Sequence, residues 1–160
     1  MLDVFVLPSG MSHADFSKTE KSIQGLTCDW IIRRPRTLKE FICCSRSYPF
    51  YMFIFDNESL DLGLQKSLNM FLKMNMFDVL VLWKKDVRNG FAEYRPRIFR
   101  SNLVLRETTF TPIAPFGLKT EGVLNGWILE HGFENTYQIE PKRFYKVATS
   151  LGQGIKSSQV

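Results

Sequence analysis

The chain has 160 residues, of which 44% are hydrophobic, 14% aromatic and 23% charged, and its formal net charge is +5 at pH 7. This composition excludes a mainly disordered chain, and the length is typical of one domain with a sizeable buried core. The modest positive charge favours anionic partners, so small molecules that carry phosphate and nucleic acids are both compatible with it.

Cysteine usage and the apolar segments indicate a cytoplasmic protein. The three cysteines form no CxxC pair and only two histidines accompany them, which disfavours a structural zinc site and indicates reduced thiols. The first ten residues lack the basic segment of a signal peptide and contain Asp3. The most apolar window, residues 41–55, is interrupted by Arg46 and Pro49, so we expect no membrane span.

The first half of the chain alternates short apolar runs with helical patterns. The apolar runs predict strands at residues 2–7, 30–32, 50–55 and 79–83. The apolar spacing predicts helices, with Ser12 and Thr37 as caps of the first two, at residues 14–25, 37–45 and 60–72. Because strands that alternate with helices form βαβ units, the pattern predicts an α/β domain with a mainly parallel sheet.

The second half of the chain has a mixed pattern. The Asn89-Gly90 pair predicts a hairpin, and residues 121–130 carry apolar side chains at helical spacing and predict a helix. Short strands are expected at residues 94–99, 103–105 and 136–139. We expect one domain over residues 1–150 and a loose tail rich in Gly, Ser, Gln and Lys over residues 151–160.

The most informative stretch for function is the apolar run that ends in Asp56, Asn57 and Glu58. In a parallel α/β sheet the carboxyl ends of the strands line the ligand crevice, and two carboxylates there can both reach one Mg²⁺ or Mn²⁺ ion. The alternative is an N-cap, because acidic and amide side chains at a helix start accept hydrogen bonds from free N–H groups. The spacing alone leaves both interpretations open.

Several local strings, in order, resemble a family 2-type glycosyltransferase with the GT-A nucleotide-sugar-binding fold. DVFVLPSG resembles its first strand and Pro-containing loop, and KSIQGLTCDWIIR is similar to a segment of the form S-I-x-x-Q-T-x-x-D-W-x-I-I. FIFDNESL resembles the metal-binding L-x-x-D-x-D-D motif, and FDVLVLWKKD with RPRIFRSNLVL resembles the strand pair and P-R-x-F-R-R region that follow. The resemblance covers residues 2–106 and implies a GT-A-like, Rossmann-like domain.

This resemblance implies transfer of a sugar from a nucleoside diphosphate to a hydroxyl acceptor. Asp56 and Glu58 take the positions of the two motif acids, with Glu58 as the direct ligand of Mn²⁺ or Mg²⁺ and Asp56 facing the ribose or the metal's waters. The cation neutralises the diphosphate leaving group. Pro8, Ser9 and Gly10 are expected beside the nucleotide base.

Two departures from the family pattern concern the donor base and the catalytic base. Arg33 and Arg34 stand where the second strand of the family ends in an acidic residue, which disfavours a UDP-sugar donor. No E-D pair follows the motif to deprotonate the acceptor, and Glu121 and Glu107 are the nearest substitutes. A shortened or degenerate, non-catalytic relative is therefore an alternative.

The basic residues suggest a second function class. They form two clusters, Arg33-Arg34-Arg36-Lys39 and Arg95-Arg97-Arg100. On the transferase hypothesis one cluster binds the diphosphate or an anionic acceptor. On the alternative hypothesis, a small basic protein that does no chemistry binds nucleic acid or a protein partner. A solvated surface is the third interpretation, and alternation along a strand predicts that Arg95 and Arg97 point outward.

His131 follows Glu130 at the end of the predicted helix. The two side chains are candidates for an acid–base pair. The simpler interpretation is that a helix C-terminus favours a histidine through its dipole.

Overall fold

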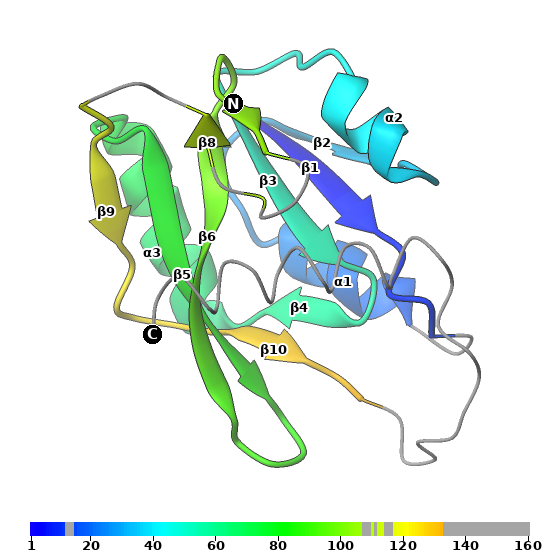
Figure 1. Ribbon diagram of the computed structural model, residues 1–160. Coiled ribbons are helices and arrows are strands. Elements are labelled where there is room, and N and C mark those ends of the chain that lie inside the picture. The colour runs from blue at the N-terminus through cyan, green and yellow to red at the C-terminus, as the bar shows by residue number, and fades with distance from the viewer. Residues whose placement is uncertain (12–14, 107–109, 111, 114–116, 133–160) are drawn as a thin grey trace.

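The computed structural model describes residues 1–11, 15–106, 110, 112–113 and 117–132, which form a curved sheet and three helices (Figure 1). The elements in chain order are β1 (Leu2–Leu7), α1 (Phe16–Ile23), β2 (Trp30–Arg33), α2 (Leu38–Cys43), β3 (Phe50–Phe55), β4 (Glu58–Leu60), α3 (Leu62–Met74), β5 (Val79–Asp86), β6 (Ala92–Arg100), β7 (Val104–Leu105), β8 (Pro112–Ile113), β9 (Thr120–Gly122) and β10 (Ile128–Glu130). The predicted α/β class is confirmed, as are the strands and helices predicted in the first half.

The main sheet has the order β2-β1-β3-β6-β5-β10-β4, and β9 also pairs with β5. β1, β2 and β3 run parallel, whereas β6 lies antiparallel between β3 and β5. β9 and β10 run parallel to β5, and β4 closes the edge antiparallel to β10. Of the eight strands in this sheet only β6 and β4 run against the others, so the sheet is mainly parallel as predicted, and its antiparallel strands β4 and β6 pair with β10, β3 and β5.

β3 forms the middle of the core because both of its faces are covered. Phe50, Met52 and Ile54 point toward the face packed by α1 and α3, and Tyr51 and Phe53 point toward the face packed by α2. This alternation follows from the two-residue period of a strand, so a continuously apolar run is buried on both sides. Helices consequently cover both faces of the sheet (Figure 1).

The helix caps are partly those that the sequence predicts. Thr37 caps α2 as predicted, with its side chain accepting from the Glu40 N–H at 3.1 Å. α1 is capped by Asp15 and not by Ser12, which lies outside the described residues. α3 is capped by Asp61, whose Oδ1 accepts from the Leu64 N–H at 2.8 Å. The N-cap interpretation of residues 56–58 is therefore wrong, because Asp56 and Asn57 form the turn before β4 and Glu58 is the first residue of that strand.

The predicted helix at residues 121–130 is wrong, since this segment contributes β9 and β10 instead. Gly126 has a φ of +104°, and a side chain there would collide with the Leu64 backbone at the start of α3. The neighbouring Trp127 N–H donates to Asp61 Oδ1 at 3.0 Å. The turn is thereby fixed on α3, which places β10 between β5 and β4.

Three further sequence predictions lie outside the described residues. These are Glu107, the strand expected at residues 136–139 and the tail at residues 151–160. None of the helices in the described part of the chain is both long and apolar enough to cross a membrane.

Candidate functional site

The carboxyl ends of five strands lie along one edge of the sheet. β1, β2 and β3 are parallel to each other, and β5 and β10 share their direction because β6 is antiparallel to both β3 and β5. The residues at or just beyond these ends are Ser9, Arg33, Asp56, Asp86 and His131. Ligands of open α/β sheets bind at such an edge, so we call it the carboxyl edge and consider it as the candidate site.

The loop after β1 and the turn after β3 are joined at this edge. The Ser9 N–H donates to Asp56 Oδ1 at 2.9 Å, and the Asp56 N–H donates to the Leu7 carbonyl at 3.0 Å. Gly10 is buried with a φ of +81°, a conformation that a glycine adopts without strain. The structure therefore brings together Pro8-Ser9-Gly10 and Asp56, which the sequence resemblance places at one ligand.

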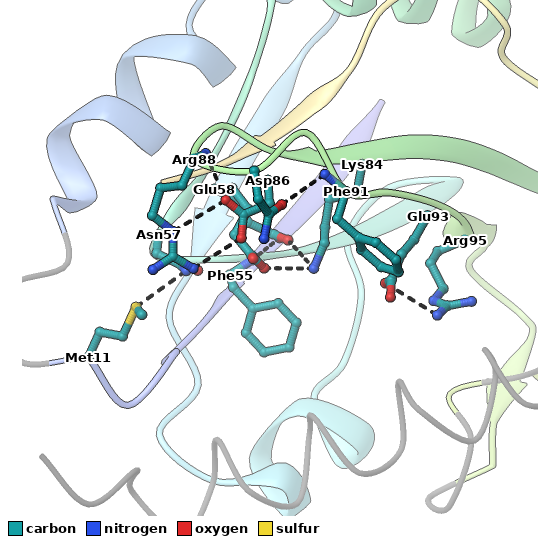
Figure 2. Close-up of polar contacts among 12 residues, drawn as sticks. Met11, Phe55, Asn57, Glu58, Lys84, Asp86, Arg88, Phe91, Glu93 and Arg95 are labelled. Carbon is teal, nitrogen blue, oxygen red and sulfur yellow. Dashed lines mark hydrogen bonds and ion pairs between the residues drawn. The ribbon is translucent and has the colours of Figure 1, made fainter. Parts of the chain in front are cut away.

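Glu58 is in a different situation, because its side chain is fully buried and paired (Figure 2). Its Oε1 and Oε2 accept from the two Nη atoms of Arg97 at 2.9 and 3.0 Å, and Lys84 Nζ lies 3.7 Å from Oε2. The Phe55 N–H adds a hydrogen bond to Oε1 at 2.8 Å. Burial alone raises the pKa of Glu58, but the attraction of Arg97 and Lys84 outweighs it and holds this pKa below its ordinary value.

This geometry tests whether the two acids fit a metal ion. Both oxygens of Glu58 are occupied by a guanidinium group, so Glu58 does not fit the direct ligand that the resemblance implies. Asp56 keeps Oδ2 free of hydrogen bonds from the described residues, and its side chain is partly exposed. Within the described part of the chain, no group of three His, Cys, Asp or Glu side chains is placed to hold an ion.

The ion pairs continue along the edge from Glu58 to a partly exposed pair. Lys84 Nζ donates to Glu130 Oε2 at 2.7 Å. Burial lowers the pKa of Lys84, but Glu58 and Glu130 reverse this and raise it above its ordinary value. Two carboxylates and two cations therefore neutralise each other over β4, β5, β6 and β10, which fixes the positions of these strands at the edge.

The outward orientation expected for two arginines of β6 is wrong. Arg95 and Arg97 are only 6% and 4% exposed. Arg95 pairs with Glu93 at 3.2 Å, and Arg97 pairs with Glu58. Sequence alternation placed both residues on one side, but it did not reveal that this side is covered. A signal was present, because Arg97 directly precedes the apolar pair Ile98 and Phe99, and an arginine that is buried with such neighbours needs a carboxylate partner.

His131 also lies at the carboxyl edge, although its predicted context is wrong. It follows a strand rather than a helix, and its backbone N–H donates to the Asn57 carbonyl at 2.8 Å. Its Nε2 lies 2.7 Å from Ser59 Oγ, whereas the neighbouring Glu130 pairs with Lys84. Burial and the nearby positive charge of Lys18 lower the pKa of His131, so the imidazole is neutral at physiological pH.

Glu121 lies away from this edge. It is exposed on β9 and pairs in register with Leu80, near the start of β5, whereas Asp86 is at the end of that strand. Six residues of strand separate the two levels by roughly 20 Å. The structure therefore does not bring Glu121 to Asp56, and Glu107 lies outside the described residues.

A cavity of about 460 Å³ lies at the end of β2, beside α2. Its walls are formed by Phe5, Arg33, Arg34, Pro35, Glu40, Cys43 and Cys44. Arg33 and Arg34, which the sequence indicates as ligand-binding residues, therefore share a hollow. Because β2 is parallel to β1 and β3, this end of β2 belongs to the same carboxyl edge as Ser9 and Asp56.

Comparison with known proteins gives similarity of fold but not of sequence. No protein-family model matches the chain. No curated protein sequence matches it either. Two solved structures of S. aureus TarS (residues 1–349), one in complex with UDP-GlcNAc and one with UDP, are similar with a TM-score of 0.52 at 10% sequence identity.

The alignments cover 92% and 94% of this chain and 64% of the TarS chain in each case. The chain therefore spans less than two thirds of the length of these structures. At this identity the likeness shows the fold alone.

Proposed function

We propose that this chain is a glycosyltransferase-like protein that binds a nucleoside-diphosphate sugar along the carboxyl edge and transfers the sugar to a hydroxyl acceptor. The observation that carries the proposal is the Ser9–Asp56 hydrogen bond of 2.9 Å, which joins the loop after β1 to the turn after β3 at the same carboxyl edge as the cavity at the end of β2. The fold is shared with a protein solved in complex with UDP-GlcNAc. The sequence resemblance to family 2-type glycosyltransferases supports the same conclusion.

On this proposal the nucleotide lies across the ends of β2, β1 and β3. The base occupies the cavity beside Arg33 and Arg34, and the diphosphate passes the loop of Ser9 and Gly10 toward Asp56. A glycine in this loop leaves room for close approach of phosphate oxygens to the backbone.

In this proposal the protein ligand of a divalent cation is Asp56, and Glu58 is not a ligand. Mg²⁺ and Mn²⁺ are commonly held by one or two carboxylates together with substrate phosphates, and the free Oδ2 of Asp56 suits this arrangement. When bound, the cation stabilises the charge of the diphosphate leaving group. Glu58, locked by Arg97, instead keeps the turn of Asp56 and Asn57 in place.

The acceptor hydroxyl also needs a base, and His131 is the best-placed candidate in the described part of the carboxyl edge. As the acceptor oxygen forms its bond to the anomeric carbon, the bond from that carbon to the diphosphate breaks and the acceptor proton passes to the imidazole. The lowered pKa of His131 keeps the ring neutral and able to accept this proton at neutral pH. Its contact with Ser59 orients the ring.

The alternative of a nucleic-acid-binding protein has less support from the structure. Arg97 and Arg100 pair with Glu58 and Asp78 at 2.9 Å each, and Arg95 pairs with Glu93. These arginines already have carboxylate partners, so they do not form the solvated basic stripe that binds a phosphate backbone.

The proposal is tested by calorimetric titration of UDP and GDP, with Mn²⁺ and with EDTA, into the wild type and Asp56→Asn. Asparagine retains an oxygen for the Ser9 N–H but removes the charge that a cation needs. We expect wild-type binding that Mn²⁺ strengthens about tenfold or more, and loss of this gain in Asp56→Asn. The matched control is Asp29→Asn, an exposed carboxylate away from the edge. Absence of nucleotide binding at millimolar concentration in the wild type contradicts the proposal.

A further inference from the structure

The cavity at the end of β2 contains hydrogen-bond donors that the fold itself does not use. Arg33 pairs in register with Phe5 on the neighbouring strand, so both side chains point toward the face covered by α2. That face is the wall of the cavity, which α2 closes with Glu40 and Cys43. A ligand in the cavity therefore meets the guanidinium group of Arg33.

Arg33 is held in one orientation by a buried carboxylate. Its Nε donates to Asp3 Oδ1 at 3.1 Å, and its Nη2 donates to Ser47 Oγ at 2.7 Å. Asp3 is fully buried, and its second oxygen accepts from the backbone N–H groups of Ser47 and Tyr48 at 2.9 Å each. A carboxylate fixed in this way pre-organises the guanidinium fork before a ligand arrives.

Most of the donors of the two arginines stay available. A guanidinium group has five N–H donors, and the described residues engage two of those of Arg33. The Arg34 guanidinium lies 3.8 Å from the centre of the Phe16 ring, and no hydrogen bond to a described residue engages it. Because Phe16 belongs to α1, the Arg34 guanidinium lies on the other face of the sheet, and Arg33 supplies the free donors that face a ligand in the cavity.

The same cavity has an acceptor on the α2 side. Glu40 Oε2 accepts from the Arg36 backbone N–H at 2.6 Å, which leaves Oε1 without a hydrogen bond from the described residues. A ligand that fits this cavity therefore needs two neighbouring hydrogen-bond acceptors for Arg33 and hydrogen-bond donors for Glu40.

Among the common nucleobases, guanine meets this pattern with two donor groups for the carboxylate, whereas cytosine, whose O2 and N3 are also neighbouring acceptors, offers only its N4 amino group. The O6 and N7 of guanine are neighbouring acceptors that an arginine fork binds with two hydrogen bonds, and its N1–H and N2 amino groups are donors for a carboxylate. Adenine places its N6 amino donor next to N7, where it opposes an arginine. Uracil offers two carbonyl oxygens separated by the N3–H donor, so it cannot accept both bonds of a fork.

We propose that the cavity beside Arg33, Arg34 and Glu40 binds a guanine base, so that the nucleotide is a guanosine diphosphate derivative. This inference rests on the proposed function, which places the nucleotide base in this cavity. It differs from the bases of the TarS complexes, which contain UDP-GlcNAc and UDP.

The experiment is competitive calorimetry of GDP, UDP, CDP and ADP with the full chain in Mn²⁺. We expect GDP to bind at least tenfold more tightly than the other three. In Arg33→Lys the charge beside Asp3 stays but the fork is lost, so the GDP preference falls about tenfold while UDP affinity is unchanged. Arg36→Lys is the matched control, because only the backbone of Arg36 contacts Glu40, and it retains the preference.

A second variant keeps the test valid if Arg33→Lys does not fold. Glu40→Gln changes an exposed residue of α2, leaves Arg33 in place and removes the charged acceptor for guanine N1–H and N2. It should also weaken GDP selectively. UDP binding equal to or tighter than GDP binding in the wild type overturns the guanine inference but leaves the proposed function standing. Failure of all four nucleotides to bind overturns both.

Discussion

Two groups of arginines have nearly the same sequence surroundings and opposite environments in the structure. Arg33 and Arg34 precede a proline at the end of β2, and Arg95 and Arg97 flank a proline inside β6. Arg97 is 4% exposed with both Nη atoms bonded to Glu58, whereas the exposed Arg34 contacts an aromatic ring. The comparison teaches that position along a strand decides the role of an arginine. In the interior both Nη atoms of Arg97 are used by a buried partner, whereas at the carboxyl end Arg33 has a buried partner for only part of its guanidinium and keeps donors for a ligand.

The two groups also differ in how much the fold depends on them. A buried ion pair adds little over an apolar pair, but removing one partner leaves a charge uncompensated. A partly exposed pair contributes far less, because water replaces the lost contact. Substitutions in the two groups should therefore separate stability from ligand binding.

The largest effect is expected for Arg97→Leu. Glu58 then stays fully buried without its bidentate partner, so the free energy of unfolding should fall by about 3–5 kcal/mol. Urea denaturation followed by circular dichroism measures this loss. Arg88→Gln is the control, since Arg88 is 42% exposed in its pair with Asp86 and its loss should cost at most about 1 kcal/mol. Equal losses in the two variants would show that Glu58 is hydrated and would restore it as a candidate metal ligand.

A smaller loss is expected for Asp3→Asn, because Asp3 is the buried partner of an arginine at the carboxyl end of β2. The buried carboxylate accepts from Arg33, Ser47 and Tyr48, and an amide can replace only part of this set. We expect the variant to lose about 1–3 kcal/mol of unfolding free energy and to bind nucleotide more weakly, because the orientation of Arg33 is no longer fixed. Unfolding and titration with GDP measure the two effects. Wild-type nucleotide affinity in this variant would show that the orientation of Arg33 is irrelevant to binding.

The Glu58 pair should also be visible in the pH dependence of stability. Its pKa is lowered in the folded state, so its contribution is complete above the ordinary glutamate value of about 4.3 and is lost as the pH falls through the folded value. Wild-type stability should therefore decrease more steeply than that of Glu58→Gln as the pH falls below about 4.3. If the free energies of unfolding of the two proteins changed in parallel with pH, the ion pair would not lower the pKa of Glu58.

The sequence predicts the β1–α1–β2–α2–β3 half of the fold because each of its elements carries its own signal. The run Phe50–Phe55 is buried on both faces wherever it lies in a sheet, and Thr37 caps α2 through a contact three residues away. The region at residues 121–130 has no such local control. Its helical spacing is overridden by the turn at Gly126 and by pairing with β5, which are tertiary effects.

The candidate site is likewise predictable only where the position of a residue follows from its own strand. Ser9 and Asp56 follow strands, so the parallel topology alone brings them to one edge. The partnership of Glu58 with Arg97 joins residues that are 39 positions apart, and no local pattern reveals it. His131 likewise reaches the edge only because the predicted helix before it is a strand.

The smallest effect on stability is expected for Arg34→Gln. This variant separates most clearly the arginines at the end of β2 from those of β6. Arg34 has one described contact, its guanidinium over the Phe16 ring, and such an exposed cation–π contact contributes at most about 1 kcal/mol. Urea denaturation should therefore give almost the wild-type free energy of unfolding, while nucleotide titration should show weaker binding. The reverse result, a large loss of stability with unchanged affinity, would place Arg34 with the structural arginines of β6. A small loss of stability with weaker binding means that the carboxyl end of β2 is kept charged for its ligand, because the fold does not require that charge.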